Sequence, residues 1–122
     1  MIFKNKIHEK TFSSKQKDFS NSNRALAAVF ILTADKDLWK RMKNNCENGQ
    51  IVFDGILLSD FSPEQYALFM AVKDLYLDET HLSITDLADK AVLDSNAFAL
   101  VMNAICIARC GMKNQKTKEV MK

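Results

Sequence analysis

Glycine and proline are scarce in this chain, which has three glycines and one proline among its 122 residues. Sandwiches, barrels and nucleotide-binding α/β folds need many tight turns, and tight turns draw heavily on these two residue types. The three glycines are also scattered, so the chain contains no glycine-rich loop of the P-loop or dinucleotide-binding kind. The composition therefore favours helices and gives no indication of nucleotide binding.

Long apolar runs are missing as well. No stretch reaches the roughly 20 consecutive apolar residues that span a bilayer. The N-terminal sequence MIFKNKIHEK lacks the apolar segment of a signal peptide. The three cysteines, an odd number, fit reduced thiols better than a disulfide framework. We therefore expect a cytoplasmic protein without a membrane partner.

The chain also lacks a strong charge of one sign, because its net charge is +2 at pH 7. Residues 1–24 carry six basic and two acidic side chains, and residues 112–122 carry four basic and one acidic. The body between them, residues 25–111, carries seven basic and twelve acidic side chains. An acidic body is the wrong arrangement for gripping a nucleic-acid backbone, although the basic ends could still bind one weakly.

Apolar residues, in contrast, are plentiful at 48% of the chain, and its length suits one hydrophobic core. The sequence predicts an all-α fold, a compact bundle of about five helices with a short extended connector and basic termini. We expect helices over residues 24–34, 63–77, 84–91 and 95–110. A further helix is expected to begin at a cap formed by Asp35 or Asp37 and to end at about Asn45.

Three regions are expected along the chain. Residues 1–23 form an N-terminal basic arm that can hold a short helix, residues 24–111 form a single helical domain, and residues 112–122 form a basic C-terminal tail. Within the arm, segment 13–23 (SSKQKDFSNSN) is polar and typical of a loop.

The clearest local pattern is the helix start at Ser62, Pro63 and Gln65, which combines an N-cap, a proline at the first helical position and a capping-box glutamine. Gly49 is expected to end the preceding helix. Segment 51–58 (IVFDGILL) suits either a small hairpin around its Asp-Gly pair or a connector. We favour the connector, because a lone hairpin is only marginally stable.

The stretch Ser83–Gly111 has the spacing of a DNA-binding helix-turn-helix, with two short helices joined by a turn. However, Val92 stands where a glycine is common, and Phe98–Ala108 is apolar at every position except Asn103. A recognition helix needs a polar face, so this helix is predicted to be buried. Nucleic-acid binding is therefore kept as the alternative, with these candidate residues: Lys90, Ser95, Asn96 and Arg109.

Enzymatic and metal sites find little support in the sequence. Cys106 lies in the most apolar helix and is expected to pack in the core, while the role of Cys110 is left open. A structural zinc site needs four ligands, which the chain does not offer in a fitting pattern. Carboxylates gather near His81, and a hydrolytic site would require Asp78, His81 and Asp86 to converge, yet caps and turns explain these acids better. We expect no catalytic residue, metal or cofactor.

A row of lysines is the remaining feature. Lys36, Lys40 and Lys43 share one side of a predicted helix, next to Trp39. They could contact an acidic protein or phosphates. The alternative is a solvated face with Trp39 in the core.

The segments LAAVFILTADKDLWKRM, IVFDGILL, SPEQYALFMAVKDLYLD and LSITDLADKAVLDSNAFALVMNAICIARCG follow one another in this order. Over about residues 3–111, this order resembles small proteins of Firmicutes phages and conjugative elements. The resemblance implies an accessory protein of a mobile genetic element in a bacterial cytoplasm. Such proteins often bind host proteins, including CRISPR nucleases and other defence systems that they inhibit.

The sequence thus leads to two hypotheses. The first is a non-enzymatic, single-domain helical protein that binds a host or element-encoded protein, in its sharpest form an anti-defence inhibitor. The second is a degenerate helix-turn-helix protein that binds DNA. The partner's identity and the oligomeric state stay open at this stage.

Overall fold

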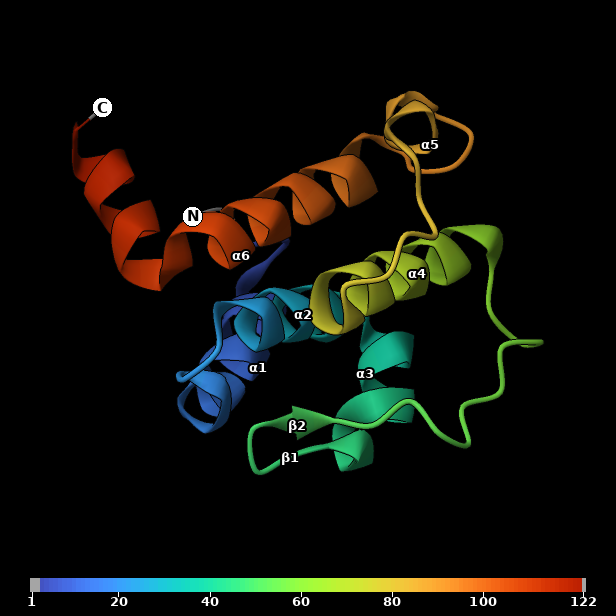
Figure 1. Cartoon of the computed structure of the whole chain (residues 1–122), viewed down its shortest axis with the longest axis horizontal. Helices are drawn as coiled ribbons and strands as arrows, with labels where there is room; N and C mark the ends of the chain where they lie inside the picture. The colour runs from blue at the N-terminus through green and yellow to red at the C-terminus, as the bar shows by residue number, and fades with distance from the viewer. Residues whose placement is uncertain (1–2, 122) are drawn as a thin grey trace.

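The elements of the fold are mostly helices, joined to one small hairpin (Figure 1). The computed structural model describes residues 3–121, and the side chains of residues 3–112. Within that range the predicted all-α bundle is confirmed. The elements are α1 (Lys6–Gln16), η1 (Lys17–Phe19), α2 (Asn23–Ala34), α3 (Lys36–Met42), η2 (Lys43–Asn45), β1 (Cys46–Glu47), β2 (Gln50–Ile51), α4 (Pro63–Leu77), α5 (Ile84–Ala88) and α6 (Ser95–Met121).

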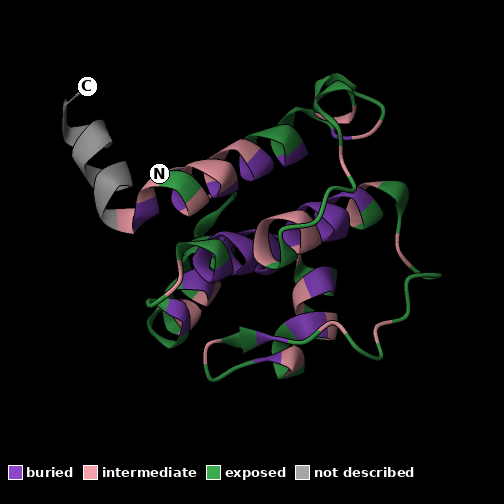
Figure 2. Cartoon of the chain, in the orientation of Figure 1, coloured by how far each residue is buried: buried purple, intermediate pink, exposed green. Residues whose placement is uncertain are grey.

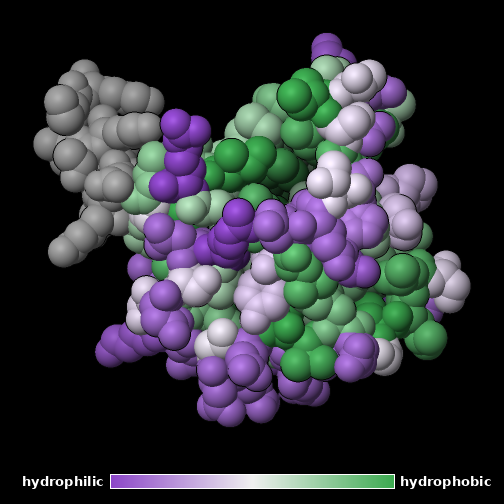
Figure 3. Space-filling model, in the orientation of Figure 1, coloured by the Kyte–Doolittle hydropathy of each residue, from purple (hydrophilic) through white to green (hydrophobic). Residues whose placement is uncertain are grey.

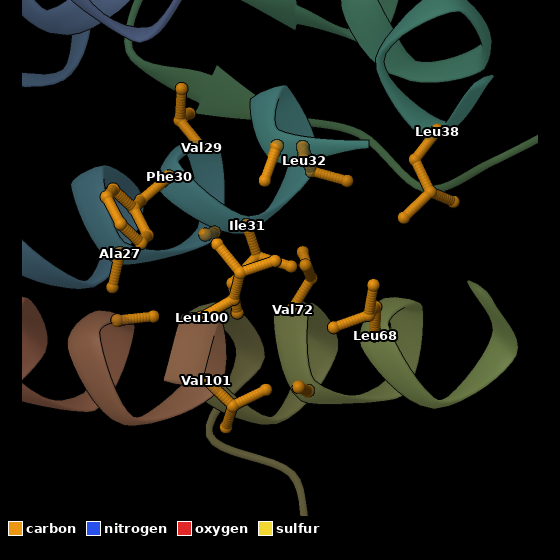
Figure 4. Close-up of a cluster of buried hydrophobic side chains, with 14 of the residues drawn as sticks. Ala27, Val29, Phe30, Ile31, Leu32, Leu38, Leu68, Val72, Leu100 and Val101 are labelled. Carbon is orange, nitrogen blue, oxygen red and sulfur yellow. The ribbon is translucent and has the colours of Figure 1, made fainter. Parts of the chain in front are cut away.

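Helix α2 forms the centre of the core. Ser22 caps it by accepting a hydrogen bond from the Ala25 N–H at 3.2 Å. Every residue from Ala25 to Ala34 is buried, which follows from a sequence that is apolar around the whole helix. Helices α1, α3, α4 and α6 all pack against it. Figure 4 shows side chains of α2 meeting those of α4 and α6, including Ile31, Val72 and Leu100.

The N-terminal region differs from the prediction, because most of segment 13–23 is not a loop. Helix α1 extends to Gln16 and continues through η1 to Phe19. Phe12 and Phe19 are fully buried, so they fix this region to the bundle. The polar residues between them lie on the solvent side. Because they outnumber the two phenylalanines, the composition of the segment predicted a loop.

His8 fastens α1 to α2 with both of its ring nitrogens. Nδ1 accepts a hydrogen bond from the Lys4 backbone N–H at 2.9 Å, and Nε2 lies 2.8 Å from the Phe30 carbonyl oxygen. Because Nδ1 accepts, Nε2 carries the proton and donates it to Phe30. The imidazole is buried beside the rings of Phe3 and Phe30. Burial lowers the pKa of His8; the Phe30 carbonyl opposes this shift, and the Lys4 ammonium adds to it.

Helix α3 begins as predicted but ends earlier. The Asp35 carboxylate caps it, accepting from the N–H groups of Asp37 and Leu38 at 3.0 Å each. Gly49 does not end this helix, which corrects the prediction. Asn48 and Gly49, both with positive φ, form the two-residue turn between β1 and β2. An Asn-Gly pair is the preferred sequence for such a hairpin turn. The connector predicted over 51–58 is confirmed from residue 52 onward and runs to residue 62 without helix or strand, whereas Ile51 belongs to β2.

Helix α4 has the predicted capping box. The Ser62 hydroxyl accepts from the Gln65 N–H at 3.1 Å, and the Gln65 side chain accepts from the Ser62 N–H at 3.0 Å. Helix α5 is shorter than predicted and stops at Ala88 rather than at residue 91. The reason is Asp89, whose extended backbone and side chain, which accepts from the Ala91 N–H at 2.9 Å, replace the next helical turn.

Helix α6 begins after Asp94, whose side chain accepts from the Ala97 N–H at 2.8 Å. Its regular conformation breaks at Gly111 (φ 73°), where the sequence predicted the helix end. The prediction that this helix is buried is correct for one side only. Leu100, Ala104 and Ile107 are buried, whereas Phe98 is 39% exposed (Figure 2).

A matched pair of leucines tests the described core. Leu32 in α2 is fully buried, while Leu57 in the connector is 70% exposed. We expect Leu32→Ala to lower the free energy of unfolding by about 2–5 kcal/mol, because it removes buried methyl groups and leaves a cavity. Leu57→Ala should change it by less than about 0.5 kcal/mol. Urea unfolding followed by circular dichroism measures both, and equal effects would contradict this core.

The environment of His8 predicts a pH dependence of stability. The pKa of His8 is lower in the folded chain than in the unfolded chain, so the folded chain binds a second ring proton less readily. The stabilisation that neutral His8 gives the fold is therefore fully present above about pH 6.5 and is lost progressively as the pH falls below that value. His8→Gln keeps a donor for the Phe30 carbonyl and does not titrate. Urea unfolding between about pH 8 and pH 5 should therefore show a loss of stability in the natural protein that is smaller in the variant. Identical pH profiles would contradict the assignment.

Candidate functional site

The predicted lysine row lies on the outer side of α3. Lys36, Lys40 and Lys43 are exposed, and at about 100° per residue they share one face, opposite buried Leu38 and Met42. Among the residues that the structure describes, no carboxylate lies within ion-pair distance of these three ammonium groups. The row is therefore free to meet charges from outside the molecule.

Trp39 borders this row. Its side chain is half-buried and packs against the edge of the core, so the structure lies between the two expectations for it. The ring is held in place by the core and still has an accessible part. A rigid aromatic side chain of this kind loses little conformational entropy when a partner covers it.

Arg41 fastens the connector along the other flank of the lysine row. Its Nη1 lies 3.5 Å from the Leu57 carbonyl oxygen and 4.0 Å from the Asp60 carboxylate. Its Nε lies 3.4 Å from the Asp37 carboxylate, and its guanidinium lies 4.9 Å from the centre of the Phe61 ring. The charge of Arg41 is thus used inside the molecule, and it holds the connector beside α3.

The connector presents apolar side chains to solvent. Leu57 is 70% exposed and Leu58 is also exposed. Figure 3 shows hydrophobic side chains gathered on the side of the molecule where the connector runs. We call the combined feature the α3–connector surface, formed by Lys36, Trp39, Lys40, Lys43, Leu57 and Leu58. The sequence indicated its lysines and Trp39 but not the leucines, because only the fold brings the connector to α3, where Arg41 contacts the Leu57 carbonyl.

The four residues of the DNA-binding alternative are all exposed, but they do not form one surface. Lys90 and Ser95 line one depression together with Phe98. Asn96 lines another, next to the N-terminal segment. Arg109 lies 13 residues beyond Asn96, which corresponds to about 20 Å along the helix and about 140° around it. The structure therefore brings Lys90 and Ser95 together and leaves Asn96 and Arg109 apart.

The acidic cluster near His81 serves the chain's own structure. Asp74 accepts hydrogen bonds from the backbone N–H groups of His81 and Leu82 at 2.8–2.9 Å, and its carboxylate lies 2.6 Å from His81 Nδ1. The other ring nitrogen, Nε2, lies 3.5 Å from the Glu79 carboxylate. Both ring nitrogens of His81 thus face carboxylates of the chain itself. This arrangement holds the loop after α4.

The remaining acids of the cluster point elsewhere. The Asp78 carboxylate pairs with Arg24 at 3.5 Å, and the Asp86 side chain accepts from the Ser83 N–H at 3.0 Å as part of a capping box. His81 and Asp86 line one depression, but Asp78 does not, so the three side chains do not converge. Among the described residues, no group of three or more histidine, cysteine, aspartate or glutamate side chains could hold a metal ion.

The cysteines correct one expectation. Cys46 is buried, and burial raises the pKa of its thiol to about 11, so it is an inert thiol at neutral pH. Cys106 was expected in the core, but it is half-exposed, as is Cys110. Helix α6 is apolar on nearly all sides, and its buried side is the one that contains Leu100 and Ile107.

Helix α6 is also apolar enough to raise the question of a membrane. By length and composition alone, Ser95–Met112 could cross a bilayer, although the sequence alone indicated no such run. In the structure, 33% of that segment is buried against the rest of the protein. Core helices pass the same test, so this is weak evidence for a membrane helix.

Comparison with known proteins adds no relative. No protein-family model matches the chain, and no curated protein or solved structure matches it.

The different environments of the thiols predict their reactivity. Iodoacetamide at neutral pH should label Cys106 and Cys110 in the folded protein and leave Cys46 unlabelled, because the buried thiol is both protonated and inaccessible. In urea all three should react. Peptide mass spectrometry identifies the labelled residues, and rapid labelling of Cys46 under native conditions would contradict the described packing.

Proposed function

We propose that this protein is a non-enzymatic accessory protein of a phage or conjugative element that acts in the bacterial cytoplasm by binding another protein through the α3–connector surface. The observation that carries the proposal is the row of three exposed lysines, which have no carboxylate partner among the described residues, on a packed helix to which Arg41 holds the connector with its exposed leucines. The partner is a host or element-encoded protein. The sharpest form of the proposal is an inhibitor of a host defence protein such as a CRISPR nuclease.

The chemistry of the surface defines what fits it. Exposed ammonium groups favour an acidic partner, and Leu57 with the accessible part of Trp39 favours apolar side chains next to the acids. Lys36, Lys40 and Lys43 break no ion pair with the residues that the structure describes when they bind. Since Leu38 and Met42 anchor α3 in the core, little ordering of the backbone is needed, which lowers the entropy cost of association.

A non-enzymatic role is supported by the use of the reactive groups. The carboxylates near His81 cap helices or hold a loop, and the Cys46 thiol is buried. The mobile-element setting is supported by the resemblance of the segment order between about residues 3 and 111. Binding to DNA through α5 and α6 remains the competing hypothesis, and the exposed side of α6 between Ser95 and Arg109 offers it mainly apolar groups.

The test is a pull-down of the tagged chain from host lysate, treated with nuclease or left untreated. The variant Lys36→Glu, Lys40→Glu, Lys43→Glu reverses the charge of the row. We expect the natural chain to retain a specific protein after nuclease treatment and the triple variant to retain at least about tenfold less of it, because an acidic partner then meets acidic side chains.

A matched control changes the same net charge elsewhere. Lys6, Lys10 and Lys17 are exposed in the α1–η1 region, and their replacement by glutamate should leave retention unchanged. Circular dichroism confirms that both variants are folded. If both variants lost the same amount of retained protein, the effect would come from overall charge, and the assignment of binding to the α3–connector surface would be wrong. Proteins that disappear with nuclease would instead favour the DNA-binding hypothesis.

A further inference from the structure

The outer side of α6 carries an apolar stripe that the core covers only in part: Met102 and Ile105 pack against the edge of the core, and Phe98 does not. Phe98 is 39% exposed, and Met102 and Ile105 are half-exposed. Together with Arg109, these residues lie within about 60° of one another around the helix, and Asp94 caps the helix before its first turn. We call these five residues the α6 stripe. Helix α6 runs along one edge of the molecule, and hydrophobic side chains gather along it (Figures 1 and 3).

The two ends of the α6 stripe carry opposite charges. Asp94 lies at the amino end and is exposed, and Arg109 lies at the other end, also exposed, about 22 Å away along the helix. Among the described residues, no carboxylate lies within ion-pair distance of Arg109. The apolar part of the stripe occupies the length between these two charges. Such a stripe is complementary to itself when it is turned end to end.

We propose that two copies of this protein associate through the α6 stripe, with their α6 helices antiparallel about a two-fold axis near Met102. In this register Asp94 of each copy meets Arg109 of the other, and Phe98 of each copy meets Ile105 of the other. A single two-fold axis produces both pairs, because residues 94 and 109 have the same midpoint along the helix as residues 98 and 105, next to Met102. A parallel arrangement would place like charges together at both ends and is disfavoured.

Two carboxylates lie close together at the amino end of the α6 stripe, which favours the binding of a cation there. Glu64 at the start of α4 lies close to Asp94, with its carboxylate 3.4 Å from the Asp94 backbone N–H. Burial raises the pKa of Glu64, and the neighbouring Asp94 carboxylate adds to that rise. The Lys4 ammonium already acts on both acids, and a guanidinium from a second copy would add a second positive charge beside them.

This inference is independent of the proposed function, because the α6 stripe and the α3–connector surface share no residue. Helices α3 and α6 lie on different sides of α2 (Figure 1). The two surfaces can therefore be tested with separate variants. A variant that no longer dimerises should still retain the same partner protein in the pull-down.

Cysteine cross-linking tests the axis position. In a Cys106→Ser, Cys110→Ser background, Met102→Cys places two thiols near the axis, and mild oxidation should give a disulfide-linked dimer. Asn103→Cys is the matched control, since residue 103 lies only about 1.5 Å further along the helix but points about 100° away. We expect cross-linking of Met102→Cys to be at least about tenfold faster than that of Asn103→Cys. Equal rates would overturn the proposal.

A charge cycle tests the antiparallel register. Sedimentation velocity over a range of concentrations should show reversible dimerisation of the natural chain. Arg109→Glu should weaken it about tenfold, because the new acid faces Asp94 of the second copy. The same change should have a smaller effect in an Asp94→Asn background, where the asparagine keeps the helix cap.

The outcomes of the cycle are decisive. A reversible dimer whose response to Arg109→Glu depends on residue 94 supports the proposal. A protein that stays monomeric at all concentrations, or an Arg109→Glu effect that does not depend on residue 94, overturns it. Circular dichroism confirms that each variant is folded, so a loss of association is not a loss of structure.

Discussion

Complete burial of α2 is the constraint on which the rest of the structure depends. Ten consecutive residues, from Ala25 to Ala34, are buried, and an all-round apolar helix is stable in water only when other elements cover every side. Helices α1, α3, α4 and α6 provide that cover. Phe30 lies on the side of α2 that the N-terminal region covers. Its ring contacts those of Phe3, His8 and Phe12, and its carbonyl accepts a hydrogen bond from His8. The docking of the N-terminal region is therefore part of the core.

The same constraint determines which surfaces remain available. Each helix that covers α2 uses one face for the purpose, and its opposite face is left to solvent or to a partner. On α3 that face carries lysines, as expected for a helix in contact with water. On α6 it carries exposed Phe98, with Met102 and Ile105 beside it only partly covered by the core. Apolar side chains on an outer helix face mark a place where association lowers the free energy.

The sequence predicted the helices whose ends are defined by local chemistry. Ser62 and Gln65 set the start of α4, Asp35 set that of α3, and Gly111 marked the break in α6, because capping and backbone freedom are properties of neighbouring residues. Tertiary properties escaped prediction. An evenly apolar α6 does not reveal which side is covered, and polar composition hid the anchoring Phe12 and Phe19. The lysines of the candidate site followed from helical spacing, whereas their neighbours in the connector depend on the position of Arg41.

The positions of the two proposed surfaces have a joint consequence. Because α2 separates α3 from α6, an α6 dimer carries its two α3–connector surfaces away from the two-fold axis, where neither blocks the other (Figure 1). Each copy then offers an exposed lysine row on a body whose acidic residues outnumber its basic ones. A local positive row on an acidic body orients an approaching acidic partner toward that row rather than attracting it to the whole surface. Two such rows in one dimer would hold a partner with two equivalent sites more tightly than a single copy could, since the second contact forms at a high effective concentration.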